Sequence, residues 1–159
     1  MNELFEWFIR WKIKINPQKT QAMIFTRRRG GMIDNIEIDE HEIPWSNLVK
    51  YLGLEMDKQL TWRSHIEKTL NKVRGTMKKL YPLTNWKSKM SLKNKLTLIK
   101  TIMRPALMYG STAWGSAAKS YINRIQTYEN SQLRVALDPP WYDRNTIIHR
   151  DLIWKSITQ

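Results

Sequence analysis

The sequence contains no cysteine, so disulfide bonds and thiolate-ligated zinc sites are excluded. It has no apolar run long enough to cross a bilayer, and its first residues lack the basic region, apolar block and small-residue site of a secretory signal. We therefore expect an intracellular protein with no membrane partner. Its 159 residues are enough for a buried core, and eight tryptophans with 42% hydrophobic residues favour a packed structure.

Acidic residues are almost absent from one stretch of the chain. Residues 61–128 contain fourteen Lys and Arg but a single acid, Glu67, whereas acids and bases balance in residues 1–60 and from Glu129 onward. This stretch therefore carries the whole net charge of +13. A polyphosphate backbone is the usual partner of such a block, because each phosphate contact releases condensed counterions. An anionic membrane surface and a solvated basic surface without a ligand are the alternatives.

The first 60 residues are predicted to combine a helix with strands. Apolar side chains recur at helical spacing in residues 2–13, and Asn16-Pro17 ends that segment. Alternating apolar residues then predict strands at 21–26, 33–38 and 49–56. Gly53 falls inside the third predicted strand, where a glycine often marks the close approach of a ligand or another backbone.

Several carboxylates and a histidine gather in residues 34–42 and raise the question of a metal site. Alternation puts Glu37 and Asp39 on the face opposite Ile36 and Ile38, which is typical of a solvated edge hairpin. We therefore predict no metal site here.

After residue 60 the pattern becomes helical. Apolar residues at steps of three and four predict a long helix: Trp62, Ile66, Leu70, Val73, Met77 and Leu80. Ser64 with Glu67 fits a capping box, Thr61 is an alternative cap, and the sequence YPLTN from Tyr81 predicts a break. Further helices are predicted after the N-cap Ser91, from Pro105, over 118–137 and over 145–157.

Twelve basic residues lie off the predicted apolar stripes of the first two helices or in the loop between them. They are Arg63, Lys68, Lys72, Arg74, Lys78, Lys79, Lys87, Lys89, Lys93, Lys95, Lys100 and Arg104. With Glu67 the one acid available to pair with them, a salt-bridged surface is disfavoured. We predict that they form a surface that follows a duplex backbone without reading bases.

Four long stretches of the chain carry a resemblance to a known family. They are LFEWFIRWKIKINPQKTQAMIF, VKYLGLEMDKQLTWRSHIEKTLNK, SLKNKLTLIKTIMRPALMYGSTAWGSA and IQTYENSQLRVALDPPWYDRN. Together they resemble the C-terminal half of a jockey-like non-LTR retrotransposon reverse transcriptase. The resemblance implies an α+β fold, in which an N-terminal helix and a small antiparallel β remnant of the polymerase palm precede an all-α thumb bundle.

The resemblance also implies a division of the chain. Residues 1–60 match the residual palm, 61–137 the basic helical thumb and 138–159 a helix after the thumb. Within the palm part, KINPQKTQAMIF matches motif D, and VKYLGLEMD matches motif E, the primer-grip hairpin.

Site residues follow from the same resemblance. Lys19 matches the motif D lysine, which would act as a general acid on the leaving pyrophosphate; a lysine that only caps a turn is the alternative. Tyr51, Leu52 and Gly53 would lie near the primer.

The catalytic motif of this family, Tyr-x-Asp-Asp, is not found in the sequence, which has no Asp-Asp pair. In the family these aspartates and an upstream one hold two metal ions. The motif is expected before Asn2, so we do not expect this chain alone to polymerise DNA. No cofactor is expected in it, whereas the intact family enzyme would use Mg²⁺.

The expected partner is RNA or an RNA–DNA template–primer duplex, and the expected location is nuclear. Two alternatives stay open: a stand-alone nucleic-acid-binding module recruited from such an element, and a remnant without function. The sequence sets no oligomeric state.

Overall fold

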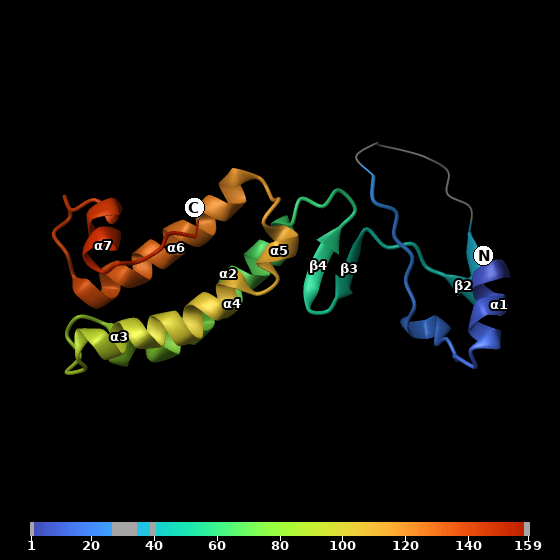
Figure 1. Cartoon of the computed structure of the whole chain (residues 1–159), viewed down its shortest axis with the longest axis horizontal. Helices are drawn as coiled ribbons and strands as arrows, with labels where there is room; N and C mark the ends of the chain where they lie inside the picture. The colour runs from blue at the N-terminus through green and yellow to red at the C-terminus, as the bar shows by residue number, and fades with distance from the viewer. Residues whose placement is uncertain (1, 27–34, 39–40, 158–159) are drawn as a thin grey trace. The chain divides into compact units, whose positions relative to one another are not determined.

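The computed structural model of this protein describes residues 2–26, 35–38 and 41–157 (Figure 1). The chain divides into two compact units, Met1–Thr61 and Trp62–Gln159. Among the described residues, the first unit holds a helix, a 3-10 turn and two antiparallel hairpins, and the second is mainly helical. The predicted α+β class is therefore confirmed.

The first helix, α1 (Asn2–Arg10), ends three residues before the predicted boundary. Lys12 adopts a positive φ of 53°, and the Ile13 N–H donates to the Phe8 carbonyl at 2.9 Å. This is the Schellman arrangement that closes a helix when one residue turns left-handed. The chain then enters the short 3-10 helix η1 (Pro17–Lys19).

The first hairpin pairs β1 (Ile36–Ile38) with β2 (His41–Ile43). Ile38 and Ile43 are buried, whereas Glu37 and Glu42 are exposed, as the alternation predicted. Three other acids of this cluster, Asp34, Asp39 and Glu40, lie outside the described residues.

The predicted strand at 21–26 is wrong. Of these residues Ala22 alone forms a β-bridge, to Trp45, and Ile24 and Phe25 are exposed. A strand buried on both faces needs a continuous ladder and cover on both sides. This segment has the isolated bridge of Ala22 and, four residues on, a hydrogen bond from the Thr26 N–H to the Lys58 carbonyl at 3.0 Å.

The single strand predicted at 49–56 is two strands. β3 (Leu48–Tyr51) and β4 (Leu54–Asp57) pair antiparallel around a two-residue turn. Leu52 and Gly53 have φ values of 47° and 80°, the signs of a type I′ turn. Gly53 thus supplies a turn conformation rather than a gap in a strand, and the alternation continued through it because the turn is so tight.

The long helix α2 (Arg63–Thr84) carries the predicted apolar stripe, with Trp62 through Met77 buried at those positions. The predicted capping box is wrong: the N-cap is Trp62, with φ of 62°, so Ser64 already lies in the first turn. The helix ends within the predicted breaking sequence YPLTN. It passes Pro82, ends at Thr84 and is capped by Asn85, whose N–H donates to the Tyr81 carbonyl at 3.0 Å.

The next helical stretch runs without a break through α3 (Leu92–Leu98), the π-helical turn η2 (Ile99–Met103) and α4 (Arg104–Met108). The Ser91 side chain caps α3 as predicted. In η2 the Arg104 N–H donates to the Ile99 carbonyl, five residues back. Pro105 follows, and the wider turn displaces the carbonyl that its ring would otherwise meet.

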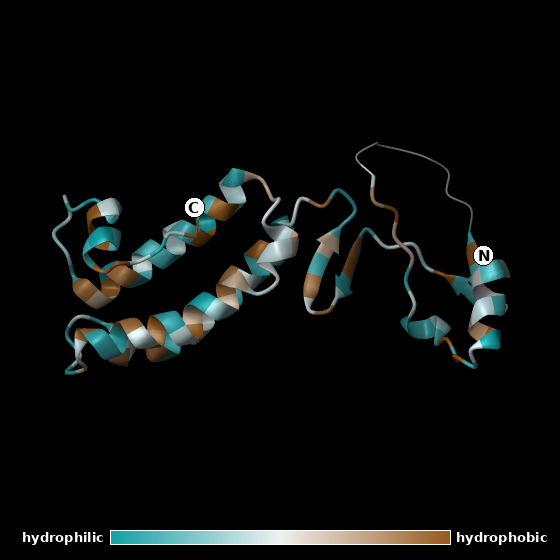
Figure 2. Cartoon of the chain, viewed as in Figure 1, coloured by the Kyte–Doolittle hydropathy of each residue, from teal (hydrophilic) through white to brown (hydrophobic). Residues whose placement is uncertain are grey.

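The second unit is completed by α5 (Ser111–Trp114), α6 (Lys119–Leu137) and α7 (Asn145–Asp151). α2 packs against α6, α4 and α3, and apolar residues from these helices form the core. Hydrophobic and hydrophilic residues are interspersed along these helices (Figure 2). No helix of the described chain is long and apolar enough to cross a membrane.

The last predicted helix, 145–157, is shorter in the structure. α7 ends at Asp151, and Ile153 has a positive φ of 50°. The residues that follow leave the helix because their backbone binds side chains of the core, as described below.

Candidate nucleic-acid interface

The outer face of α2 carries a row of exposed lysines. Lys68, Lys72 and Lys79 are spaced by four and seven residues, so they lie on one helical face, opposite the buried stripe. Lys78 is exposed beside them. We call Lys68, Lys72 and Lys79 the α2 lysine row.

A different side of α2, which carries Arg63, Glu67 and Arg74, is turned toward α6. Arg124 on α6 and Arg63 on α2 both bind the Glu67 carboxylate, with N–O distances of 3.0 and 3.3 Å. Hydrogen bonds lower the pKa of Glu67, and the one from Arg124 contributes more than the one from Arg63. The Arg74 guanidinium lies over the Tyr128 ring, 5.6 Å from its centre. The acid of this stretch is thus held by arginines and does not offset the lysine row.

The loop between α2 and α3 continues the basic surface. Lys87, Lys89 and Lys93 are exposed, and the Lys87 Nζ lies 5.2 Å from the centre of the half-exposed Trp86 ring. The loop is fixed at its start, where Ser88 Oγ donates to the Leu83 carbonyl at 2.6 Å. Lys87 and Lys89 therefore extend from an ordered loop, and Lys93 extends from the first turn of α3.

Lys95 does not belong to this surface, contrary to the prediction. It is 4% exposed, and its Nζ donates to the Trp86 carbonyl at 3.3 Å. It fastens the α2–α3 loop to α3. Lys95 stands three residues after Leu92 and four before Ile99, so helical spacing places it beside the apolar face, which meets the loop.

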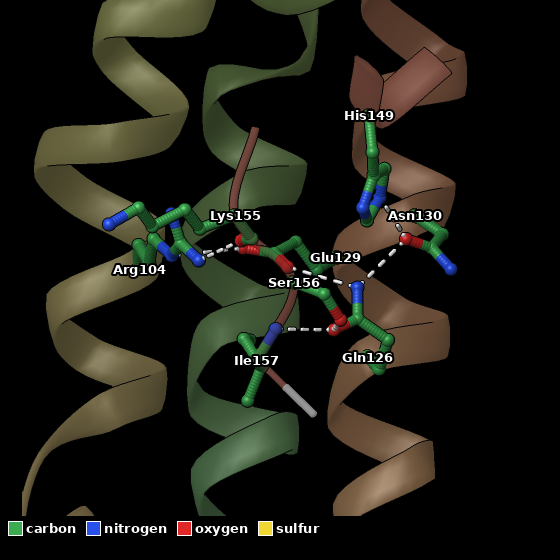
Figure 3. Close-up of polar contacts among 8 residues, drawn as sticks. All are labelled: Arg104, Gln126, Glu129, Asn130, His149, Lys155, Ser156 and Ile157. Carbon is green, nitrogen blue, oxygen red and sulfur yellow. Dashed lines mark hydrogen bonds and ion pairs between the residues drawn. The ribbon is translucent and has the colours of Figure 1, made fainter. Parts of the chain in front are cut away.

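Arg104 also faces inward. Its Nε lies 3.3 Å from the carboxylate of Glu129, which is fully buried in α6, and its guanidinium donates to the Lys155 carbonyl (Figure 3). Burial raises the pKa of Glu129, and the charge of Arg104 opposes this shift. Arg104 is thus a structural partner of a buried acid.

Lys100, although exposed, is turned toward the end of the chain. Its Nζ lies 4.9 Å from the centre of the buried Trp154 ring, and the Arg104 guanidinium lies 5.3 Å from the same ring. Such cation–π contacts stabilise an aromatic ring that is held against a helix. These two bases fix the segment after α7.

A chain of polar side chains surrounds Glu129 (Figure 3). The Gln126 amide donates to Glu129 at 3.1 Å and to the Asn130 oxygen at 2.9 Å, which also meets His149 Nε2 at 2.8 Å. Because that oxygen only accepts, His149 donates from Nε2. The Gln126 oxygen accepts from the Ser156 hydroxyl and the Ile157 N–H, at 2.7 and 2.6 Å. This network attaches the final segment to α6.

This network was not predicted, although the sequence contains one sign of a buried acid. Glu129 lies on α6 four residues after Ile125 and four before Leu133, which are both buried. An acid therefore occupies a position on the apolar face of the helix. A buried carboxylate needs a charged partner, and Arg104 supplies it.

Lys19 lies at the end of η1 with an exposed side chain. Its N–H and the Thr20 N–H donate to the carbonyls of Asn16 and Pro17, both at 3.1 Å. η1 packs against β2, so Lys19 is presented by a braced turn.

The predicted primer-grip residues form the tip of the second hairpin. Tyr51 and Leu52 are 60% and 71% exposed, and Leu52 adopts a positive φ that is unfavourable for a branched side chain. Lys19 belongs to the part of the unit that contains β2, whereas these residues belong to the separate β3–β4 sheet.

Comparisons with known proteins point to one group of enzymes. The chain is 40% identical over 147 residues to a protein named probable RNA-directed DNA polymerase from transposon X-element of Drosophila melanogaster, covering 92% of this chain and 16% of that protein. It is 37% identical over 153 residues to the probable RNA-directed DNA polymerase from transposon BS of the same fly, covering 96% and 17%. The RNA-directed DNA polymerase from mobile element jockey, also from this fly, is 32% identical over 147 residues, with 92% and 16% covered.

Neither a family model nor a solved structure matches the chain. The chain spans about a sixth of the length of the curated relatives that it matches. Over nearly its full length, this chain is homologous to one segment of the jockey-like non-LTR retrotransposon reverse transcriptases.

Proposed function

We propose that the chain is a segment of a non-LTR retrotransposon reverse transcriptase and that its helical unit binds the template–primer duplex. The observation that carries this proposal is the placement of charge. The whole excess of +13 falls in residues 61–128, and much of it is exposed on α2 and the α2–α3 loop. A helix face of this kind suits phosphate contacts that are independent of base sequence.

The assignment of parts belongs to the same proposal. Residues 1–60 would be a remnant of the palm, 61–137 the thumb and 138–159 a segment that follows it. A hairpin at VKYLGLEMD supports the comparison with motif E, because the resemblance requires a hairpin there. Tyr51, Leu52 and Gly53 at its tip would contact the primer strand.

The chemistry of the whole polymerase would come from elsewhere in such an enzyme. RNA-directed DNA synthesis with Mg²⁺ needs a group of carboxylates. Within the described residues no three His, Asp or Glu side chains are arranged to hold a metal ion. We propose that the part of this chain is to hold the duplex, in the nucleus.

Lys19 is the one residue for which we propose a chemical role, as proton donor to the leaving pyrophosphate. Its exposed position on a braced turn supports this proposal. In a polymerase completed with the catalytic aspartates, Lys19→Ala should slow single-nucleotide addition by about 10²-fold, the usual contribution of a general acid. Lys19→Arg separates charge from proton donation. An unchanged rate for Lys19→Ala would contradict the chemical role and would mean that Lys19 only caps the turn.

Duplex binding is tested directly with the chain and a labelled RNA–DNA hybrid. We expect an affinity that falls steeply with salt, by about one power of the salt concentration for each phosphate contacted, and that is equal for two unrelated sequences. Fluorescence anisotropy between low and moderate ionic strength measures it. Absent or salt-insensitive binding would contradict the proposal, including its stand-alone form, in which the chain binds duplexes without any polymerase.

A further inference from the structure

Gly75 stands exposed in the middle of α2 without an internal reason for being glycine. A Cβ built at this position would meet nothing within 4 Å. The described glycines with a positive φ are Gly53 and Gly110, so the backbone at Gly75 suits any residue. Glycine in a helix interior is destabilising relative to alanine. Within the described part of the helical unit, neither packing nor backbone conformation therefore accounts for this glycine.

The position of Gly75 on the helix is informative. It lies three residues after Lys72, seven after Lys68 and four before Lys79, so it belongs to the same face as the α2 lysine row. The row spans about 16 Å along the helix axis, with Gly75 inside its longer gap. Between Lys72 and Lys79 this face therefore has, at Gly75, a position with no side chain over the helix backbone.

The arginine flank of α2 does not share this feature. Arg74 contacts Tyr128 on α6, and Arg63 shares Glu67 with Arg124 of α6. Gly75 is therefore not at the α2–α6 contact, where a small residue would let two helices approach. What can approach Gly75 comes from outside the unit, and the charge around it selects an anion.

We propose that Gly75 is the point at which the phosphodiester backbone of the bound duplex comes closest to α2. The inference rests on the duplex binding proposed above. Lys68 and Lys72 would hold phosphates on one side of this point and Lys79 on the other. A side chain at Gly75 would stand between these lysines and keep the sugar–phosphate chain away from the helix, which lengthens all three contacts.

The proposal makes stability and binding change in opposite directions. Gly75→Ala should raise the Tm by about 2–4 °C, because alanine favours the helix and meets no neighbour. The same variant should bind an RNA–DNA hybrid more weakly, and Gly75→Leu should lose about tenfold near 0.1 M salt, the value of one phosphate contact. Thermal unfolding and anisotropy are measured on the same samples of the full chain.

The matched control is Ala106→Leu, which enlarges an exposed small residue on α4. It should leave the affinity unchanged. If the wild-type chain binds the hybrid and both Gly75 variants bind equally well, the role of Gly75 is overturned while duplex binding stands. If the wild-type chain does not bind, the proposed function fails first, so the two failures are distinguishable.

Discussion

Replacing Glu129 with alanine should lower the free energy of unfolding of the helical unit by about 3 kcal/mol, the usual result of removing one partner from a buried ion pair. Glu129 is fully buried, and its loss leaves the Arg104 guanidinium without its counter-ion and removes one of the two acceptors of the Gln126 amide. Gln126 then also orients Ser156 and Ile157 less well. Urea unfolding followed by circular dichroism measures the effect.

The control for this prediction removes both charges. Arg104→Met with Glu129→Leu replaces the pair by apolar groups of similar size, and we expect it to recover most of the lost stability. If Glu129→Ala stays within about 0.5 kcal/mol of the wild type, a value typical of surface changes, the network does not stabilise the unit.

Burial raises the pKa of Glu129, which fixes the sign of its pH dependence. The folded state then binds the proton more tightly than the unfolded chain. The stability associated with the neutral carboxyl is complete below the ordinary pKa of glutamate and is lost as pH rises through the raised value. Glu129→Gln carries no such group, so its stability should lack this decline.

The second large effect concerns the α2 lysine row. Replacing Lys68, Lys72 and Lys79 together with glutamine should weaken RNA–DNA hybrid binding by roughly 10²-fold or more near 0.1 M salt. The slope of log affinity against log salt should fall by about 2 to 3, roughly one for each phosphate contact removed. Anisotropy titrations at several salt concentrations give both quantities.

A matched variant separates the effect of where the lysines lie from the effect of the total net charge. Lys12, Lys14 and Lys50 are exposed lysines of the first unit, and replacing them with glutamine lowers the net charge from +13 to +10, as in the first variant. It should retain nearly all of the affinity. Equal losses in both variants would mean that total charge, rather than the α2 face, governs binding.

Much of the helical unit could be predicted from the sequence because its signals are local. The stripe from Trp62 to Met77 and the Ser91 cap depend on residues a few positions apart, and both are as predicted. The charge excess is also a local count. The end of α2 also falls within the predicted YPLTN sequence, although the helix passes Pro82 before it ends at Thr84.

The direction of individual basic side chains could not be predicted in this way. Lys95 and Arg104 were both predicted on the basic outer surface, yet Lys95 reaches the Trp86 carbonyl and Arg104 reaches Glu129 on α6. Each contact depends on which elements pack together, which helical periodicity does not specify. At Gly53 the resemblance implied a hairpin that residue patterning did not find, since a two-residue turn preserves alternation.

Lysine acetylation measured by mass spectrometry tests, residue by residue, whether the α2 lysine row contacts the duplex. With RNA–DNA hybrid present, acetylation of Lys68, Lys72 and Lys79 should slow, while Lys12 and Lys14 of the first unit react as before. Lys95, which is buried, should react slowly in both conditions. If other lysines are protected while Lys68, Lys72 and Lys79 react as fast as they do without the hybrid, the α2 lysine row does not contact the duplex.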